Sequence, residues 1–147
     1  MTLLVLTIAS SLLAADLALR GYRIPLIDLA GEKQGQVIVD REPGQYLGHP
    51  TTVLLEDGRT ILCVYPKEHG KGPIVLKRST DGGLTWSERL PLPATWSTGK
   101  ETPTMHRVVD AAGKKRLIVW FGLYPARLAS SEDDGAKIGR ASCRERV

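Results

Sequence analysis

The chain has 147 residues, of which 42% are hydrophobic, and this is enough for one small domain with a buried core. Its formal net charge is +4, but residues 137–147 contribute +3 of it, which leaves +1 for the rest of the chain. This balance excludes the strongly basic surface typical of nucleic-acid-binding proteins, so we expect no nucleic-acid partner. The two cysteines, Cys63 and Cys143, exclude a disulfide-rich scaffold.

Residues 1–18 form an apolar stretch that ends in small residues and is typical of a secretory signal peptide. The stretch lacks the usual basic residue before its apolar run, so a buried N-terminal helix or strand remains the alternative. It is too short for a membrane span. We therefore expect an exported protein, periplasmic or extracellular, with no stable membrane insertion after removal of the signal.

Residues 36–78 predict a series of short strands separated by turns. A first strand is expected at 36–40, and two more at 51–55 and 60–65 flank the Asp57-Gly58 turn. The segment 66–73 contains Gly70 and Gly72 and is expected to be a loop, followed by a strand at 74–78. Cys63 lies in an apolar run, which predicts a buried, unreactive thiol.

The same order recurs further along the chain. Strands are expected at 107–109, 116–121 and 126–130, with a turn at 110–113 and a loop at 123–125. Pro50 and Pro103 are 53 residues apart, while Ser79 and Ser131 are 52 apart. The short strands, the frequent glycine and proline and the constant interval predict an all-β fold. Repeated units of four strands favour propeller blades over a sandwich.

Each unit ends in the motif Ser-x-Asp-x-Gly-x-Thr-Trp. In the motif the Asp is expected to accept backbone hydrogen bonds, the Gly to adopt a backbone angle that a Cβ disfavours, and the Trp to bury its ring. We interpret it as structural, although a catalytic role for its carboxylates is the alternative. The first copy consists of Ser79, Asp81, Gly83, Thr85 and Trp86, and the second retains Ser131, Asp133 and Gly135.

The second copy breaks off at Lys137-Ile138, where Thr-Trp is expected. Residues 138–147 resemble the translation of a sequencing adapter, so we interpret 137–147 as an artefactual tail and the chain as incomplete. The alternative is a genuine basic tail that contacts nucleic acid or a membrane. The domain is then expected to span residues 19–136.

The motif resembles the Asp-box, or bacterial neuraminidase repeat, and residues 35–136 resemble two blades of a sialidase-type propeller. This resemblance implies a six-bladed β-propeller and an exo-acting glycoside hydrolase that releases a terminal, acidic sugar such as sialic acid. A glycan or glycoconjugate is then the expected partner. The fragment itself is expected to be inactive, because the family's nucleophilic Tyr, its Glu and two further Arg would belong to later blades. The alternative is a non-catalytic Asp-box propeller that binds glycan or protein.

The resemblance also implies candidate site residues. His49 takes the place of the family's first carboxylate-binding Arg, although Arg23, in Arg23-Ile24-Pro25, is a second candidate. A histidine is a weaker, pH-dependent ligand for a carboxylate. The segment 67–72 corresponds to the family's acid/base loop but has no Asp, so Glu68 or His69 would act as the acid, with Lys67 binding substrate. Glu101 would reach the same face from the second blade, with His106 and Arg107 deeper in that blade.

Other catalytic signatures are not found in the sequence. It has no Gly-x-Gly-x-x-Gly that opens a helix, no Gly-x-Ser-x-Gly and no paired-cysteine metal site. We therefore expect no cofactor and no metal.

Overall fold

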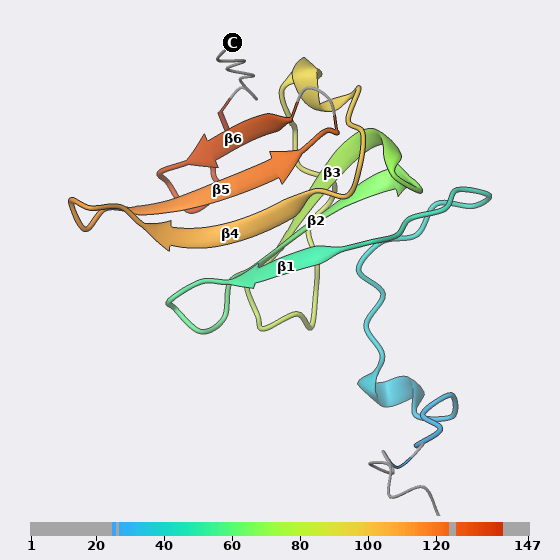
Figure 1. Ribbon diagram of the computed structural model, residues 1–147. Helices are drawn as coiled ribbons and strands as arrows, with labels where there is room; N and C mark the ends of the chain where they lie inside the picture. Colours follow the sequence, from blue (N-terminus) through green and yellow to red (C-terminus); the bar gives the residue numbers. More distant parts are fainter. Residues whose placement is uncertain (1–24, 26, 124–125, 140–147) are drawn as a thin grey trace, which may run out of the picture. The chain divides into compact units, whose positions relative to one another are not determined.

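The computed structural model describes residue 25, residues 27–123 and residues 126–139. The chain divides into two units, residues 1–34 and residues 35–147, and the elements that concern function lie in the second. The described residues form strands and two short 3-10 helices, which confirms the all-β prediction (Figure 1). The elements are η1 (Lys33–Gly35), β1 (Thr51–Leu54), β2 (Ile61–Glu68), β3 (Lys71–Ser79), η2 (Ala94–Trp96), β4 (Thr104–Val109), β5 (Lys115–Phe121) and β6 (Arg127–Ser131).

The strands form two antiparallel sheets, a first sheet in the order β1-β2-β3 and a second in the order β4-β5-β6. The predicted turns between the first two strands of each sheet are present. In the first, Asp57 Oδ1 accepts hydrogen bonds from the backbone N–H groups of Arg59 and Thr60 at 2.9 and 2.8 Å. In the second, Asp110 Oδ1 accepts from Ala112 and Lys114 at 2.9 Å. Each turn is thus closed by an aspartate side chain.

Three strand predictions are wrong. Residues 36–40 form no strand, and Val39 instead offers its carbonyl oxygen to Lys77 Nζ at 2.7 Å. The expected loop at 66–73 is mostly strand, because β2 and β3 continue almost to a tight turn at His69-Gly70. Strand β4 begins at Thr104, three residues earlier than predicted.

Each sheet has three regular strands rather than the four that a blade was expected to contain. An irregular segment takes the place of a fourth strand beside β3. There the N–H of Ser87 donates to the carbonyl of Arg78 at 2.8 Å, and that of Leu90 donates to Leu76 at 2.9 Å. The segment therefore runs antiparallel to β3, but its bonds are too sparse for a regular ladder.

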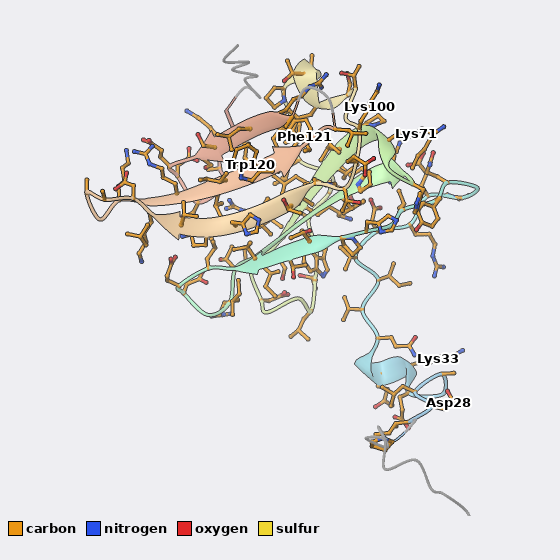
Figure 2. The ribbon with its side chains drawn as sticks, viewed as in Figure 1. Asp28, Lys33, Lys71, Lys100, Trp120 and Phe121 are labelled. Atoms are coloured by element: carbon orange, nitrogen blue, oxygen red, sulfur yellow. The ribbon has the colours of Figure 1, made fainter. Side chains whose placement is uncertain are left out.

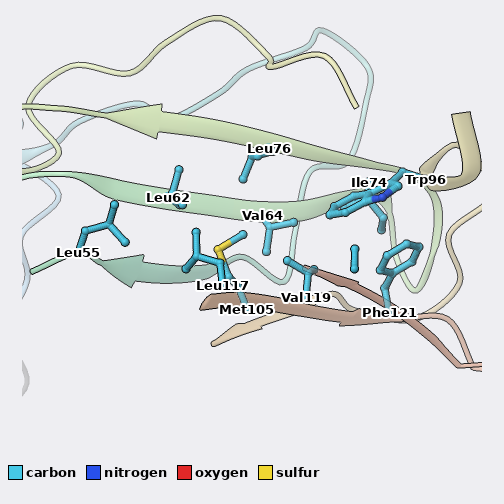
Figure 3. Packing of buried hydrophobic residues seen from close by; sticks show 11 residues of the cluster. Leu55, Leu62, Val64, Ile74, Leu76, Trp96, Met105, Leu117, Val119 and Phe121 are labelled. Atoms are coloured by element: carbon cyan, nitrogen blue, oxygen red, sulfur yellow. The ribbon is translucent and has the colours of Figure 1, made fainter. Parts of the chain in front are cut away.

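The main hydrophobic core lies between the two sheets (Figure 3). Strand β5 contributes alternate residues to it, as expected when one face of a strand is buried. Burying one such side chain stabilises the fold by about 1.5–3 kcal/mol. Its members are Leu55, Leu62, Val64, Ile74, Leu76, Trp96, Met105, Leu117, Val119, Phe121 and Ala129.

The two sheets pack with non-equivalent faces in contact. Ile61 pairs with Ser79, and Leu117 pairs with the equivalent Ser131, so Leu117 corresponds to Ile61 and Val119 to Cys63. Val119 faces the core between the sheets, whereas Cys63 lies in a second cluster with Tyr65 and Val75. Opposite faces of equivalent strands therefore meet at the interface. Such a heterologous interface allows the same step to be repeated.

The second sheet leaves exposed the face that the first sheet buries. In the first sheet Val64 pairs with Leu76, and in the second sheet Trp120 pairs with Leu128 at the equivalent position. Trp120 therefore corresponds to Val64, and Leu128 to Leu76. Val64 is fully buried, whereas Trp120 is 47% exposed on β5 (Figure 2). We call Ile118, Trp120 and Leu128 the outer face of the second sheet.

A short connection joins the two sheets at one end. Lys71 forms a β-bridge with Lys100, and both residues are labelled in Figure 2. The N–H of Glu101 donates to the carbonyl of Gly70 at 2.7 Å, and that of Gly122 donates to Lys100 at 2.6 Å. The turn between β2 and β3 therefore lies beside the end of β5. Polar residues from both sheets meet at this end.

Candidate functional site

The first copy of the repeated motif is a closed set of hydrogen bonds directly after β3. Asp81 Oδ1 accepts from the N–H of Thr85 at 2.9 Å, and Asp81 Oδ2 accepts from the Thr85 hydroxyl at 2.6 Å. The Ser79 hydroxyl donates to Asp81 at 2.7 Å and accepts from the N–H of Gly83 at 2.8 Å. Gly83 has φ +92°, which confirms the predicted need for glycine. The Thr85 hydroxyl and N–H hold the pKa of Asp81 at about 2.

Trp86 closes the same motif. Its indole N–H donates to the carbonyl of Gly83 at 3.1 Å, and its half-buried ring packs against the cluster of Cys63, Tyr65 and Val75. The predicted packing role is confirmed, although burial is incomplete. The burial of Cys63 is also confirmed, and it raises the pKa of the thiol to about 11, so the thiol is unreactive at neutral pH.

The second copy repeats these bonds after β6. The Ser131 hydroxyl donates to Asp133 at 2.7 Å and accepts from the N–H of Gly135 at 2.9 Å. The N–H of Lys137 takes the place of the Thr85 N–H and donates to Asp133 Oδ1 at 2.9 Å. Ile138 stands at the position of Trp86, and it packs against the main core between the sheets. Both copies have the geometry of a structural clasp, in which the Asp carboxylate accepts hydrogen bonds from its own loop.

The candidate site lies at the opposite end of the first sheet. Ser79 pairs with the first residue of β2, whereas His69 follows the last residue of β2. His49 Nε2 and His69 Nδ1 lie 2.7 Å apart. The centroid of the Tyr46 ring lies 6.3 Å from that of His49 and 6.1 Å from that of His69. The structure thus brings together two residues that are 20 positions apart in the sequence.

Two predicted carboxylates flank this histidine pair. Glu68 lies at the end of β2, and its carboxylate is 3.3 Å from Lys71 Nζ. Glu101 is bonded through its backbone to Gly70, the residue after His69. Both side chains are exposed. The arrangement offers imidazole and carboxylate groups to solvent, which suits binding or proton transfer at a surface.

Lys67 does not face this site as a free cation. Its ammonium lies 2.9 Å from Glu42, and Glu42 is also 2.5 Å from Arg89. Hydrogen bonds from Lys67 and Arg89 lower the pKa of Glu42. A cation so neutralised is a poor carboxylate ligand for a second partner.

Lys67 and Arg89 belong to a charged network that the sequence analysis did not predict. Arg89 Nε donates to Asp40 Oδ2 at 2.7 Å, and the hydroxyl of Tyr65 donates to the same carboxylate. Burial alone would raise the pKa of Asp40, but the bonds from Arg89 and Tyr65 lower it on balance. Burial and the bond to Asp40 raise the pKa of Tyr65. The network covers the outer surface of β2 and is saturated, so we interpret it as structural.

A small apolar pocket adjoins His49. Its volume is about 180 Å³, and its lining includes Gly48 and Pro50, the two neighbours of His49, with Cys63 and Tyr65. A larger cavity of about 490 Å³ lies at the other end, between residues 90–93 and 135–138. We favour the smaller pocket as part of the site, because the residues on both sides of His49 line it.

The remaining candidates lie elsewhere. Arg107 binds Glu56 and Asp134 at 2.8 and 2.7 Å, at the end where the clasps are. His106 is exposed on the outer face of β4, next to the buried Met105. Arg23 lies outside the described residues, as do the predicted signal peptide and residues 140–147.

Neither a family model, nor a curated protein, nor a solved structure matches this chain. Among the residues that the structure describes, no helix is long and apolar enough to cross a membrane. The same residues contain no group of three or more His, Cys, Asp or Glu side chains arranged to hold a metal ion.

Proposed function

We propose that this chain is part of an exported, sialidase-like β-propeller that hydrolyses the bond to a terminal acidic sugar of a glycan. Its substrate would bind at the end of the sheets that carries His49, Glu68, His69 and Glu101. The observation that carries the proposal is the separation of two kinds of polar group. The repeated clasps lie at one end of the sheets, and exposed titratable side chains from both repeats gather at the other.

The packing of the sheets supports the propeller in particular. Opposite faces of equivalent strands meet, so each added unit would present the same face for the next one. A sandwich of two sheets would instead leave the outside polar. The outer face of the second sheet carries Ile118, Trp120 and Leu128, which a further unit would bury.

The proposed chemistry assigns a separate role to each group. His49, when protonated, would bind the sugar carboxylate through charge-assisted hydrogen bonds. His69 or Glu68 would donate a proton to the departing glycosidic oxygen, as the acid of a glycosidase does. Glu101 would accept hydrogen bonds from sugar hydroxyls. The Gly48 and Pro50 surface would contact the apolar side of the sugar ring.

One observation favours a binding module as the second candidate. In the described part of the chain, no tyrosine hydroxyl bonds to a glutamate, because Tyr65 donates to Asp40 instead. A nucleophile of the sialidase kind would therefore have to come from residues outside that part. Without it, the same end would bind an acidic sugar and leave it intact.

Saturation-transfer NMR with free sialic acid, and with galactose as the neutral sugar, tests the proposal. We expect transfer to sialic acid and not to galactose, with a loss of signal in His49→Ala and in Glu101→Ala. The matched control is His106→Ala, which removes an exposed histidine from another face. Equal signals for both sugars, or signals that the control also loses, would contradict an acidic-sugar site. Because this chain alone is expected to be inactive, release of sugar from a sialyl glycoside by the full reading frame would then separate the hydrolase from the binding module.

A further inference from the structure

The contact between His49 and His69 has a geometry that suits a second ligand besides the proposed sugar. The two rings meet edge to face, with centroids 4.5 Å apart and planes at 63°. His49 Nε2 and His69 Nδ1 point at one another at 2.7 Å. Their other ring nitrogens have no partner among the described residues.

The backbone fixes both histidines in place. His49 has φ 52° although it carries a side chain and precedes Pro50. That conformation is uncommon for such a residue and persists only where surrounding structure imposes it. His69 occupies the tight turn between β2 and β3, where Gly70 has φ 64° and its carbonyl accepts the N–H of Glu101. The surrounding backbone thus fixes where both histidine side chains leave the chain.

We propose that His49 and His69 bind one divalent transition-metal ion, with Zn²⁺, Ni²⁺ and Cu²⁺ as the fitting chemical class. Imidazole nitrogen suits these ions, and affinity rises along the series to Cu²⁺. With metal–nitrogen bonds of about 2.0–2.1 Å, two nitrogens on a tetrahedral ion lie about 3.3 Å apart. To admit the ion, the observed pair has to open by about 0.6 Å and both rings have to tilt, so that their lone pairs converge on the metal and not on each other. Both side chains are exposed, so this movement disturbs no packed core.

The proton balance of the step is simple. In the neutral pair one histidine donates an N–H to the other, whereas metal binding requires a lone pair on both facing nitrogens. The donor therefore moves its proton to the other nitrogen of its own ring through solvent. That nitrogen faces no competing donor among the described residues. No net proton is released from a neutral pair, and the metal replaces the shared hydrogen.

The site would be an open one. With two protein ligands, the remaining coordination positions belong to water, since the described residues supply no third ligand in place. The neighbouring carboxylates of Glu68 and Glu101 favour a cation there, although Lys71 offsets Glu68. Water-filled positions on a bound metal exchange readily for carboxylate or hydroxyl oxygen. The metal site does not depend on the proposed sugar chemistry.

Metal titrations without sugar test this site. Zn²⁺ binding followed by calorimetry should give one site per chain. The affinity for Zn²⁺ should fall more than about 10-fold in His49→Ala and in His69→Ala, because losing a direct ligand costs more than losing a residue that only orients one. His106→Ala, which removes the third histidine of the chain, should leave the affinity unchanged. Equal affinities in all four proteins, or a loss in His106→Ala as well, would overturn the proposal.

Electron paramagnetic resonance of the wild-type protein with one equivalent of Cu²⁺ gives a readout that needs no variant to fold. Coupling to two imidazole nitrogens supports the site, whereas one or none contradicts it. Sialic acid binding measured with a chelator present distinguishes the two proposals. Retained sugar binding alongside absent metal binding would reject the metal site alone, and the reverse result would reject the sugar site alone.

Discussion

The carboxylate of Asp81 accepts the backbone N–H of Thr85 at 2.9 Å, and Asp133 accepts that of Lys137 at the same distance. The second clasp closes although lysine replaces threonine. The backbone bond therefore depends on the Asp and on the glycine turn, and not on the identity of the donor residue. The threonine adds only its hydroxyl bond, which the second clasp lacks.

This relationship predicts unequal effects for two substitutions. Asp81→Ala removes the acceptor for the Thr85 N–H and hydroxyl and for the Ser79 hydroxyl, so we expect the melting temperature to fall by several degrees. Thr85→Val removes one hydroxyl at constant shape and should lower it much less. Thermal unfolding followed by circular dichroism measures both. Equal losses would mean that the hydroxyl, and not the backbone, sets the stability of the clasp.

Trp86 on the first repeat and Trp120 on the second offer a matched comparison. Trp86→Ala removes a half-buried ring from Cys63, Tyr65 and Val75, and we expect a loss of about 2 kcal/mol, below the 3–5 kcal/mol of a fully buried ring. Trp120→Ala removes an exposed ring and should cost under about 1 kcal/mol. Urea unfolding of both variants gives the values. A larger loss for Trp120 would mean that its ring is covered in solution.

Most of the strands, the two hairpin turns and the clasps were predictable because each depends on residues close together in the sequence. The segment 66–73 was not, because Pro66 and Pro73 indicate a loop. The pairing of β1 with β2 ends at Val64, so Pro66 has a strand on one side only. A proline without a hydrogen to donate is tolerated at such a local edge.

The site could be predicted only in part. His49 and His69 were expected at one end of a blade, and the structure places them in contact. The ion pair of Lys67 with Glu42, which removes Lys67 from the site, was not predictable. It follows from the path of residues 39–47 over the sheet. Arg89 and Asp40 are 49 positions apart, and neither belongs to a regular strand. No local pattern encodes such a pairing.

The lowered carboxylate pKa values predict acid sensitivity. A hydrogen bond from Arg107 holds the pKa of Glu56 at about 2, and bonds from Thr60 and from Thr85 do the same for Asp57 and Asp81. Each folded-state pKa is below the unfolded value of about 4 to 4.5, so the stability from these groups is complete only above about pH 5 and is lost as the pH falls towards 2. Melting temperatures across that range should drop steeply.

The matched variant for this acid effect is Asp81→Asn, which cannot titrate at that position. Its melting temperature should start lower at neutral pH and fall less between about pH 4 and pH 2 than that of the wild type. Parallel curves for the two proteins would show that the Asp81 carboxylate does not contribute to the loss.

The outer face of the second sheet predicts self-association. Ile118, Trp120 and Leu128 correspond to residues that the first sheet buries, and water now contacts Trp120 over 47% of its surface. Apolar sheet faces of this kind associate to remove that contact. We expect the molar mass from light scattering to rise with concentration, and Trp120→Lys to suppress the rise. Leu84→Lys, at a residue that is 71% exposed on the first clasp, should not. Suppression by both variants would attribute the effect to added charge, and suppression by neither would place the contact on another surface, such as the unpaired edge of β1 or β4.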